Sequence, residues 1–284
     1  LEGIARAGFK YVCFGTTHEK QPVPDPEASD SETEALGRQV ADAGLTPIMC
    51  FFPSGGPTGD GGVDLWKRRI DQARILGIGH VLAWGPWEYE SWPGKKYAAA
   101  VWKEMTDQWF AAMEPVARHA ESAGVLVVLK PHTGVTAFGN RLKETIERIG
   151  SANVQACYDG GNVHFYEGLD PALDIRDCAE YVKAICVKDH RGLRGNPEFP
   201  CPGEGEVDDR AMLEALRPFG FDGPVVVERF EGPHKKAEMV PALIDGLAAQ
   251  ACAYLERVKA ELGSCHPQRR RRGRAGATRG RCGG

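Results

Sequence analysis

Short apolar runs rich in β-branched residues recur along the chain and alternate with segments of helical periodicity. Each run stays apolar over almost its whole length, which is typical of strands buried on both faces of a parallel sheet. The pattern therefore predicts an α/β fold. The predicted strands are Tyr11–Thr16, Pro47–Phe52, His80–Trp84, Val125–Lys130, Val154–Asp159, Ala184–Asp189 and Pro224–Phe230.

The segments between these runs repeat apolar residues every three or four positions, which predicts helices that cover the sheet. One helix is predicted to begin at Ser31, which has the spacing of a capping box with Glu34, and to end near Gly44. The other predicted helices are Val63–Leu76, Ala98–Gly124, Leu142–Ile149, Pro171–Ala179, Asp208–Leu216 and Lys236–Leu262.

Seven strands that alternate with helices predict a (β/α)8 TIM barrel. Because a helix-like segment, Leu1–Gly8, precedes the first predicted strand, we expect the first strand of this barrel to be absent from the sequence. The competing fold is a doubly wound open sheet. Such sheets often carry a Gly-rich phosphate loop after the first strand, and Gly15–His18 stands there instead. The barrel is predicted over 1–262, followed by a disordered Arg/Gly-rich tail over 263–284.

Charge and cysteine usage narrow the class of protein. The 284 residues have a formal net charge of −4, but without the seven arginines of the tail the body holds 28 basic and 39 acidic residues. An acidic body argues against nucleic acid as a partner. Nine scattered cysteines without a CxxC motif, and no apolar run of membrane length, predict a cytoplasmic protein that does not contact membranes. A homo-oligomer stays open.

Polar and charged residues gather where the last four predicted strands end. Barrel enzymes place their reactive groups at the carboxyl ends of the strands, so these side chains predict one reaction centre. A Gly-rich loop, Pro202–Asp208, contributes Glu204 to this set. The candidate residues are Lys130, His132, Asp159, Asn162, His164, Lys188, His190, Glu204 and Glu228.

Four phrases resemble a known family. They are YDGGNVHFYEG at 158–168, VKDHRG at 187–192, GEGEVD at 203–208 and VVVE at 225–228. Over residues 1–262 the chain is similar to the xylose-isomerase-like sugar phosphate isomerases and epimerases of the AP-endonuclease-2-like superfamily. The endonuclease branch uses a metal cluster rich in His and acids and a basic surface, which this sequence lacks.

The resemblance implies one divalent metal held by Glu, Asp, His and Glu from strands five to eight. It also implies a hydroxy-ketone substrate and two glutamates that move a proton through an enediolate. Asp159 and Glu228 match two of these ligands. Lys130 falls where the strand-five Glu is expected and Cys186 where the His is expected, while Asn162 stands where the family often has His.

Three interpretations of Lys130 follow from this partial match. Lys130 is catalytic together with Asp159 and Glu228, as a base or Schiff-base lysine of lowered pKa. Alternatively, it forms an inert or ligand-binding ion pair with the two acids. In the third interpretation Asp159, Glu228 and His132 hold a rearranged site for Mn, Mg, Zn or Co. His132, Asn162, His164, Lys188, His190 and Glu204 are predicted to bind substrate.

The predicted function is that of a sugar or sugar phosphate isomerase or epimerase. Its substrate is expected to be a small hydroxy-ketone, keto-sugar or polyol. Two alternatives remain on the same barrel: a lyase or hydrolase that acts on a keto-sugar or glycoside, and a catalytically degenerate barrel that binds carbohydrate.

Overall fold

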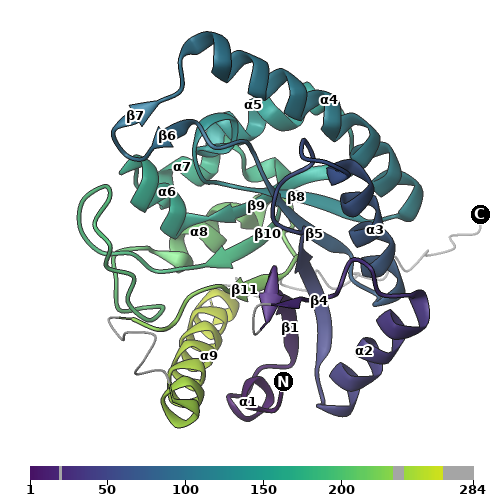
Figure 1. Cartoon of the computed structure of the whole chain (residues 1–284). Helices are drawn as coiled ribbons and strands as arrows, with labels where there is room; N and C mark the ends of the chain where they lie inside the picture. Colours follow the sequence, from purple (N-terminus) through teal and green to yellow (C-terminus); the bar gives the residue numbers. More distant parts are fainter. Residues whose placement is uncertain (19–20, 233–239, 265–284) are drawn as a thin grey trace, which may run out of the picture.

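Seven parallel strands form one sheet that curves into a nearly closed barrel in the computed structural model (Figure 1). The structure describes residues 1–18, 21–232 and 240–264. Neighbouring strands in the sheet follow the order of the sequence, as in a barrel and unlike a doubly wound sheet. In sheet order the strands are β1 (Tyr11–Phe14), β4 (Thr46–Phe51), β5 (His80–Trp84), β8 (Leu126–Lys130), β9 (Val154–Asp159), β10 (Val182–Val187) and β11 (Val225–Val227).

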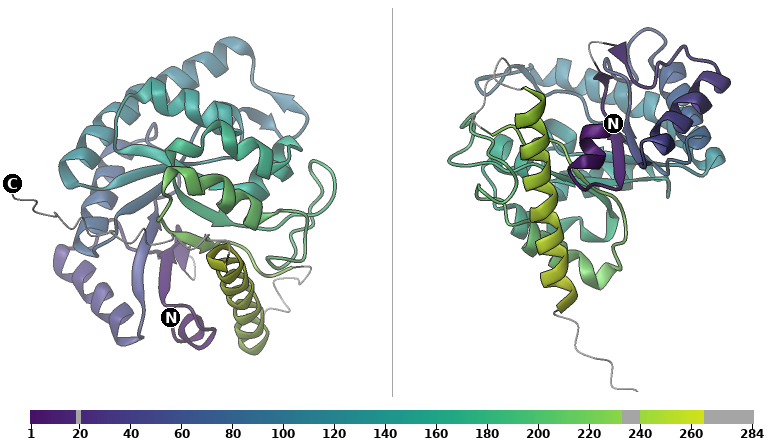
Figure 2. Two further views of the ribbon diagram at one scale, coloured as in Figure 1. Left: turned by 180° about the vertical axis from the view of Figure 1, so that it is seen from behind. Right: turned by 90° about the horizontal axis from the view of Figure 1, so that it is seen from below.

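Helices surround the barrel on its outer side (Figure 2). Two small antiparallel hairpins lie outside the sheet, β2 (Thr17–His18) with β3 (Gln21–Pro22) and β6 (Tyr89–Ser91) with β7 (Lys95–Lys96). The α-helices are α1 (Glu2–Arg6), α2 (Asp30–Asp42), α3 (Gly62–Ile75), α4 (Ala99–Ala123), α5 (Gly139–Ile149), α6 (Gly160–Glu167), α7 (Pro171–Asp174), α8 (Asp209–Leu216) and α9 (Pro241–Ser264). Single 3-10 turns occupy Gly134–Thr136, Ile175–Asp177, Ala179–Tyr181 and Arg217–Phe219.

The strand ring is open between β1 and β11, which each pair with one neighbour in the described part of the chain. The predicted barrel with seven strands is thus confirmed, and the doubly wound alternative is wrong. The helical layer continues across this seam, because α1 packs against α9 (Figures 1 and 2). Arg6 of α1 donates to Asp245 of α9, with 2.8 Å between Nη2 and Oδ2.

The start of α2 differs from the prediction. The capping box is formed by Ser29 and Glu32, not by Ser31 and Glu34, so the helix begins two residues earlier. Both pairs have the same spacing, and the sequence alone does not distinguish them. The predicted helix start at Lys236 and all but the first two residues of the predicted tail lie outside the described residues.

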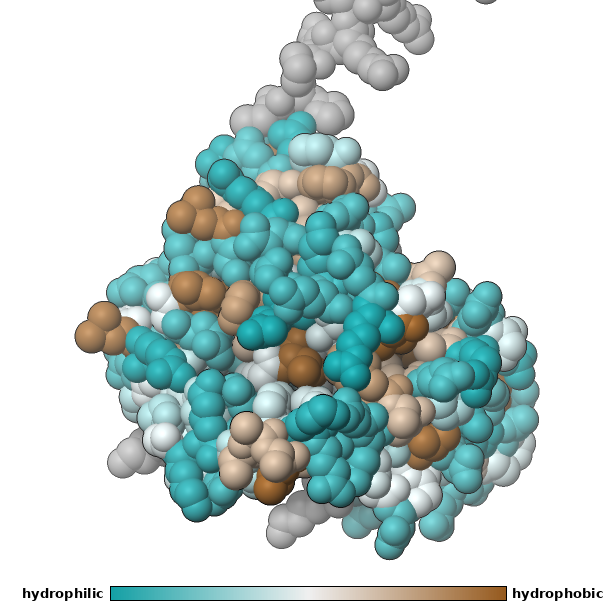
Figure 3. Space-filling model, turned by 90° about the horizontal axis from the view of Figure 1, so that it is seen from above, coloured by the Kyte–Doolittle hydropathy of each residue, from teal (hydrophilic) through white to brown (hydrophobic). Residues whose placement is uncertain are grey.

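Two apolar layers stabilise the barrel. The outer layer lies between strands and helices, where the rings of Phe52 and Trp66 stack with their centroids 3.9 Å apart. The inner layer fills the barrel and includes Met49, Leu82 and Cys157. The face seen in Figure 3 is mainly hydrophilic, with apolar residues in small separate groups. None of the described helices combines the length and the apolar composition that crossing a membrane would take.

A buried acid at the start of α8 makes the stability of the fold depend on pH. Burial raises the pKa of Asp209 to about 7. In the unfolded chain an Asp side chain has a pKa of about 3.9. Between this pH and about pH 7, the folded protein therefore keeps a proton on Asp209 that the unfolded chain has lost. The contribution of this proton to stability is therefore complete below about pH 4 and is lost as the pH rises through 7.

We expect Asp209→Asn to remove this loss and to raise the free energy of unfolding at pH 8 by on the order of 4 kcal/mol. The amide oxygen still accepts from Tyr254, whose hydroxyl lies 3.1 Å from Oδ2. Urea titrations at pH 5 and pH 8 measure the effect. Asp208→Asn is the matched control, because Asp208 caps α8 from an exposed position and Asn caps equally well. Equal pH dependence in both variants would contradict the assignment.

Candidate active site

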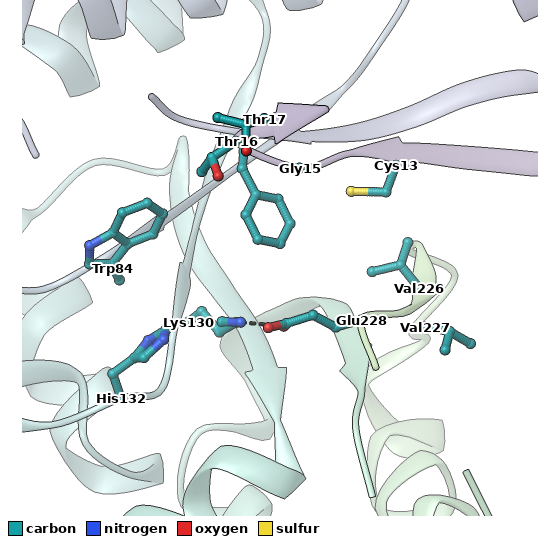
Figure 4. Close-up of a pocket in the computed structure, with 11 residues that line it drawn as sticks. Cys13, Gly15, Thr16, Thr17, Trp84, Lys130, His132, Val226, Val227 and Glu228 are labelled. Atoms are coloured by element: carbon teal, nitrogen blue, oxygen red, sulfur yellow. Dashed lines mark hydrogen bonds and ion pairs between the residues drawn. The ribbon is translucent and has the colours of Figure 1, made fainter. Parts of the chain in front are cut away.

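A pocket of about 460 Å³ opens at the carboxyl ends of the strands. In Figure 4, Lys130 and Glu228 point toward each other across its floor, with Trp84 and His132 on one side and Val226 and Val227 on the other. The other lining residues are Cys13, Gly15, Thr16, Thr17 and Phe51. Of the nine residues predicted for the reaction centre, Lys130, His132 and Glu228 line this pocket.

Two lysines and two carboxylates form a charge cluster behind and along the pocket floor. Lys130, the last residue of β8, forms ion pairs with Glu228 after β11 and with Asp159 at the end of β9, the latter at 3.3 Å. Lys188, after β10, contacts the same carboxylates, at 3.4 Å from Asp159 and 2.8 Å from Glu228. Glu228 keeps 24% of its side chain exposed, whereas the other three are almost completely buried. The cluster has no net charge when all four groups are ionised.

Asn162, in the first turn of α6, connects three of the four strands that carry this cluster. Its Nδ2 donates to the carbonyl of Pro131 at 2.7 Å, and its Oδ1 accepts from Lys188 at 2.8 Å. Its backbone N–H donates to Oδ1 of Asp159 at 2.8 Å. Substrate binding was predicted for Asn162, and in the structure its amide is buried and bonded to the protein on both sides.

The ionisation of the cluster follows from its contacts. Burial lowers the pKa of Lys130, but the carboxylates of Asp159 and Glu228 outweigh burial and the net shift is upward. Burial likewise raises the pKa of Glu228, and the two lysines outweigh it, so the net shift is well downward. Complete burial raises the pKa of Asp159 against the two ammonium groups, whose distances indicate an ionised carboxylate.

The lowered pKa that was expected for a base or Schiff-base lysine is therefore wrong for Lys130. Both roles need the neutral amine, and two adjacent carboxylates favour the ammonium form. The structure instead presents a fixed positive charge at the pocket floor.

His132 is held as a neutral imidazole. Burial and the charges of Lys130 and Lys188 lower the pKa of His132 to about 3. Its ring lies between those of Trp84 and Tyr166, with centroids 6.4 Å and 5.8 Å away. Its Nδ1 is buried and has no hydrogen-bond partner among the described residues. A neutral imidazole at the pocket wall offers one N–H donor and one acceptor.

A divalent ion does not fit the donor atoms of this cluster. The group of potential ligands that lie within 4.8 Å of one another in the described chain is Asp159, Cys186 and Glu228, without the predicted His132. A hydrogen bond with Cys157 and burial raise the pKa of the Cys186 thiol well above its usual value in the protein without metal.

Both carboxylates already bind two ammonium groups. An ion bound at about 2.1 Å to Oδ2 of Asp159, the oxygen that both lysines share, would lie within roughly 5.5 Å of both lysine nitrogens. The repulsion is about 3 kcal/mol for each pair of unit charges, and a divalent ion beside two lysines makes four such pairs.

The carboxylate of Asp189 binds backbone N–H groups of the Gly-rich loop. Its Oδ2 accepts backbone N–H groups of Gly203 and Gly205 at 2.9 and 2.7 Å. Its Oδ1 accepts those of His190 and Val207 at 2.8 and 3.1 Å. A side chain at Gly205 would place its Cβ 2.1 Å from the carboxylate, which explains the glycine. This residue was not singled out as a loop anchor, although a loop with many free N–H groups requires an acceptor.

Three residues predicted to bind substrate have protein partners outside the pocket. Glu204 accepts from Gln250 of α9 at 2.6 Å. The buried His190 places Nδ1 2.9 Å from Nδ1 of His164 and Nε2 2.7 Å from the carbonyl of Asn196. Since both nitrogens of His190 are bonded within the protein, the pair supports the loop after β10.

Residues 1–250 match the model of a protein family that is described as the xylose isomerase-like TIM barrel. Among curated proteins, an inosose dehydratase of Lacticaseibacillus casei is 24% identical over 151 residues, which are 45% of this chain and 49% of that protein. An inosose dehydratase of Glaesserella parasuis serovar 5 is 26% identical over 140 residues, or 42% and 45% of the two chains. The chain thus spans about half the length of the curated relatives it matches.

Solved structures show the same fold at low sequence identity. A xylose isomerase domain protein from Planctomyces limnophilus superposes with a TM-score of 0.71, at 19% identity and 93% coverage of each chain. A xylose isomerase-like TIM barrel protein from Mycobacterium smegmatis in complex with magnesium gives 0.70, at 17% identity and 92% and 87% coverage. D-psicose 3-epimerase from Clostridium cellulolyticum H10 with D-tagatose also gives 0.70, at 16% identity and 90% and 91% coverage.

Proposed function

Because this chain belongs to the xylose isomerase-like TIM barrel family, we propose that it is an enzyme that moves a proton next to the carbonyl group of a keto-sugar or keto-polyol, as an isomerase or epimerase. One observation carries the proposal. A fixed ammonium group, Lys130, and an ionised, partly exposed carboxylate, Glu228, meet at the floor of a pocket large enough for a small carbohydrate.

The residues of the pocket suit this chemistry. Removing a proton beside a carbonyl places negative charge on the carbonyl oxygen, and a fixed cation next to this oxygen stabilises the charge. Lys130 supplies that cation, and neutral His132 supplies a hydrogen-bond donor. Glu228 is deprotonated at neutral pH and lies at the pocket surface, where it is placed to accept the proton. Its lowered pKa makes it a weak base, so the step depends on the stabilisation of the product charge by Lys130.

Loss of water is the second candidate, and one geometric observation favours it. Epimerisation requires a proton to leave one face of a carbon and to return on the opposite face. Lys130 and Glu228 contact each other and thus approach a substrate from the same side. Elimination of water needs one base and one proton donor, which this arrangement supports. The two curated relatives named above are both called inosose dehydratase.

Incubation with a panel of keto-sugars and keto-polyols in D2O tests both candidates together. We expect deuterium to enter the carbon next to the carbonyl, which proton NMR detects as loss of one signal. A new epimer or isomer identifies the first candidate, and a conjugated enone detected by its ultraviolet absorbance identifies the second. Tight binding of a keto-sugar without exchange or product would contradict both and would support a barrel that only binds carbohydrate.

A further inference from the structure

We propose that the ammonium groups of Lys130 and Lys188 take the place of a divalent cation in this protein. The reaction centre therefore excludes metal, and Lys130 contacts the substrate oxygen directly. The catalytic part of this inference rests on the proposed function. Metal exclusion does not, because it concerns the protein without substrate.

Every carboxylate oxygen of the cluster lies beside a donor group of the protein. Oδ1 of Asp159 accepts the backbone N–H of Asn162, and Oδ2 lies 3.3 and 3.4 Å from the two lysine nitrogens. Oε2 of Glu228 contacts Lys130, and Oε1 lies 2.8 Å from Lys188. A metal ion that bound Oδ2 of Asp159 or either oxygen of Glu228 would have to displace a lysine, and the displaced ammonium would remain buried.

Lys188 is held in place by its contacts. Lys188 is 6% exposed and its Nζ donates to Asn162 Oδ1 at 2.8 Å, while Asn162 is itself fixed by Pro131. Gly161 lies so close to the backbone of Lys188 that a Cβ on it would meet the carbonyl oxygen at 2.1 Å. The end of β10 and the start of α6 are therefore packed against each other, and Lys188 stays on the two carboxylates.

The two lysines have different roles. Lys130 lines the pocket, so it is the catalytic group that contacts a substrate oxygen. Lys188 is not among the lining residues and acts through the carboxylates, which makes it a positioning residue. By neutralising Asp159 and Glu228 from behind, Lys188 leaves part of the charge of Lys130 available to the substrate. One lysine between two carboxylates would instead face the pocket with a net negative charge around it.

Cobalt binding to the whole purified chain, stripped with EDTA, tests metal exclusion without any substrate. We expect calorimetry and elemental analysis to find no Co²⁺ in the wild-type cluster. The double variant Lys130→Met/Lys188→Met frees Asp159, Cys186 and Glu228, and we expect it to bind one Co²⁺ at least about 100-fold more tightly. A thiolate-to-cobalt charge-transfer band would identify Cys186 as a ligand. The control Lys103→Met removes an exposed lysine of α4 and should behave as the wild type.

Stoichiometric Co²⁺, Mn²⁺ or Mg²⁺ in the wild type, lost in Asp159→Asn, would overturn the proposal. If the double variant does not fold, Lys130→Arg retains the positive charge and should also bind no metal. Its binding of Co²⁺ would equally overturn the proposal. For Lys188, we expect Lys188→Met to lower kcat and to shift its pH profile while leaving KM nearly unchanged, and a loss of stability alone would contradict its positioning role. A protein that excludes metal but exchanges no substrate proton would refute the proposed function and leave metal exclusion standing.

Discussion

Replacing Lys130 with methionine is expected to lower turnover by about 10²–10³-fold, because it removes the fixed cation beside the developing negative charge. It also leaves Asp159 and Glu228 with one lysine instead of two. Breaking a buried ion pair by removing one partner costs about 3–5 kcal/mol, so we expect a large fall in the free energy of unfolding. Urea denaturation and steady-state kinetics with the substrate found by deuterium exchange measure the two effects.

Two comparisons separate the charge of Lys130 from its bulk. Lys130→Arg keeps the charge in a different shape and should recover most of the stability but only part of the activity. Lys103→Met is the matched control, since this lysine is 78% exposed and pairs with Asp107 across one turn of α4. Exposed pairs of this kind contribute under about 1 kcal/mol. A Lys130→Met protein with unchanged turnover would exclude a catalytic role for this residue.

Replacing Asp189 with asparagine is expected to cost about 3–5 kcal/mol of the free energy of unfolding. Three of the four N–H groups that it accepts belong to the Gly-rich loop and the fourth is that of His190, and an amide offers an acceptor to only one pair of them. The NH2 group would face two N–H donors in a buried place. Because Asp189 directly follows Lys188, we also expect the charge cluster to loosen and turnover to fall.

Asp170→Asn is the matched control for this loop anchor. Asp170 is an exposed N-cap of α7 that accepts the N–H of Ala172 at 2.9 Å. Asparagine caps a helix as well as aspartate, so the cost should stay below about 0.5 kcal/mol. Equal stability losses at Asp189 and Asp170 would show that the loop does not depend on the carboxylate.

The strands could be predicted from the sequence because each is buried on both faces and therefore reads as a continuous apolar run. The predictions for β5 and β9 match the observed ends. For the other strands, the majority of the predicted ends differ from the observed ends by one or two residues. Tertiary contacts decide what the pattern leaves open. Two capping boxes of equal spacing overlap before α2, and only packing selects Ser29.

Helix α6 was missed because Gly160 and Gly161 have low helix propensity and precede a polar segment. Both glycines are required by close packing, since a Cβ on Gly160 would meet Met212 at 2.7 Å and one on Gly161 would meet the backbone of Lys188. Asp159 compensates by capping the helix, with its carboxylate on the N–H of Asn162. The sequence did contain one signal for this helix: an Asp at the end of a strand, with an Asn three positions later.

The structure brings part of the predicted set of residues together, but their individual contacts did not follow from the sequence. Residues at strand ends converge by topology, and Lys130, Asp159 and Glu228 do lie together. Lys188 lies two residues after Cys186, so both side chains point to the same side of β10. The alternation of side chains along the strand therefore predicts that Lys188 also approaches Asp159 and Glu228. Whether a polar side chain binds a ligand or its own loop depends on contacts between distant segments. For that reason His190 binds its own loop, and Glu204 binds Gln250 of α9.

The seam between β1 and β11 has a consequence for motion. In a closed ring, every strand is released only when two ladders of hydrogen bonds break, whereas a strand at the seam of the described sheet is held by one. Backbone amides of β1 and β11 should therefore exchange with deuterated solvent before those of β5, β8 and β9. Glu228 directly follows β11, so the acid that faces both lysines is carried by an edge strand. We expect opening of that edge to change the distance between Glu228 and Lys130, because the strand of Lys130, β8, has two partners.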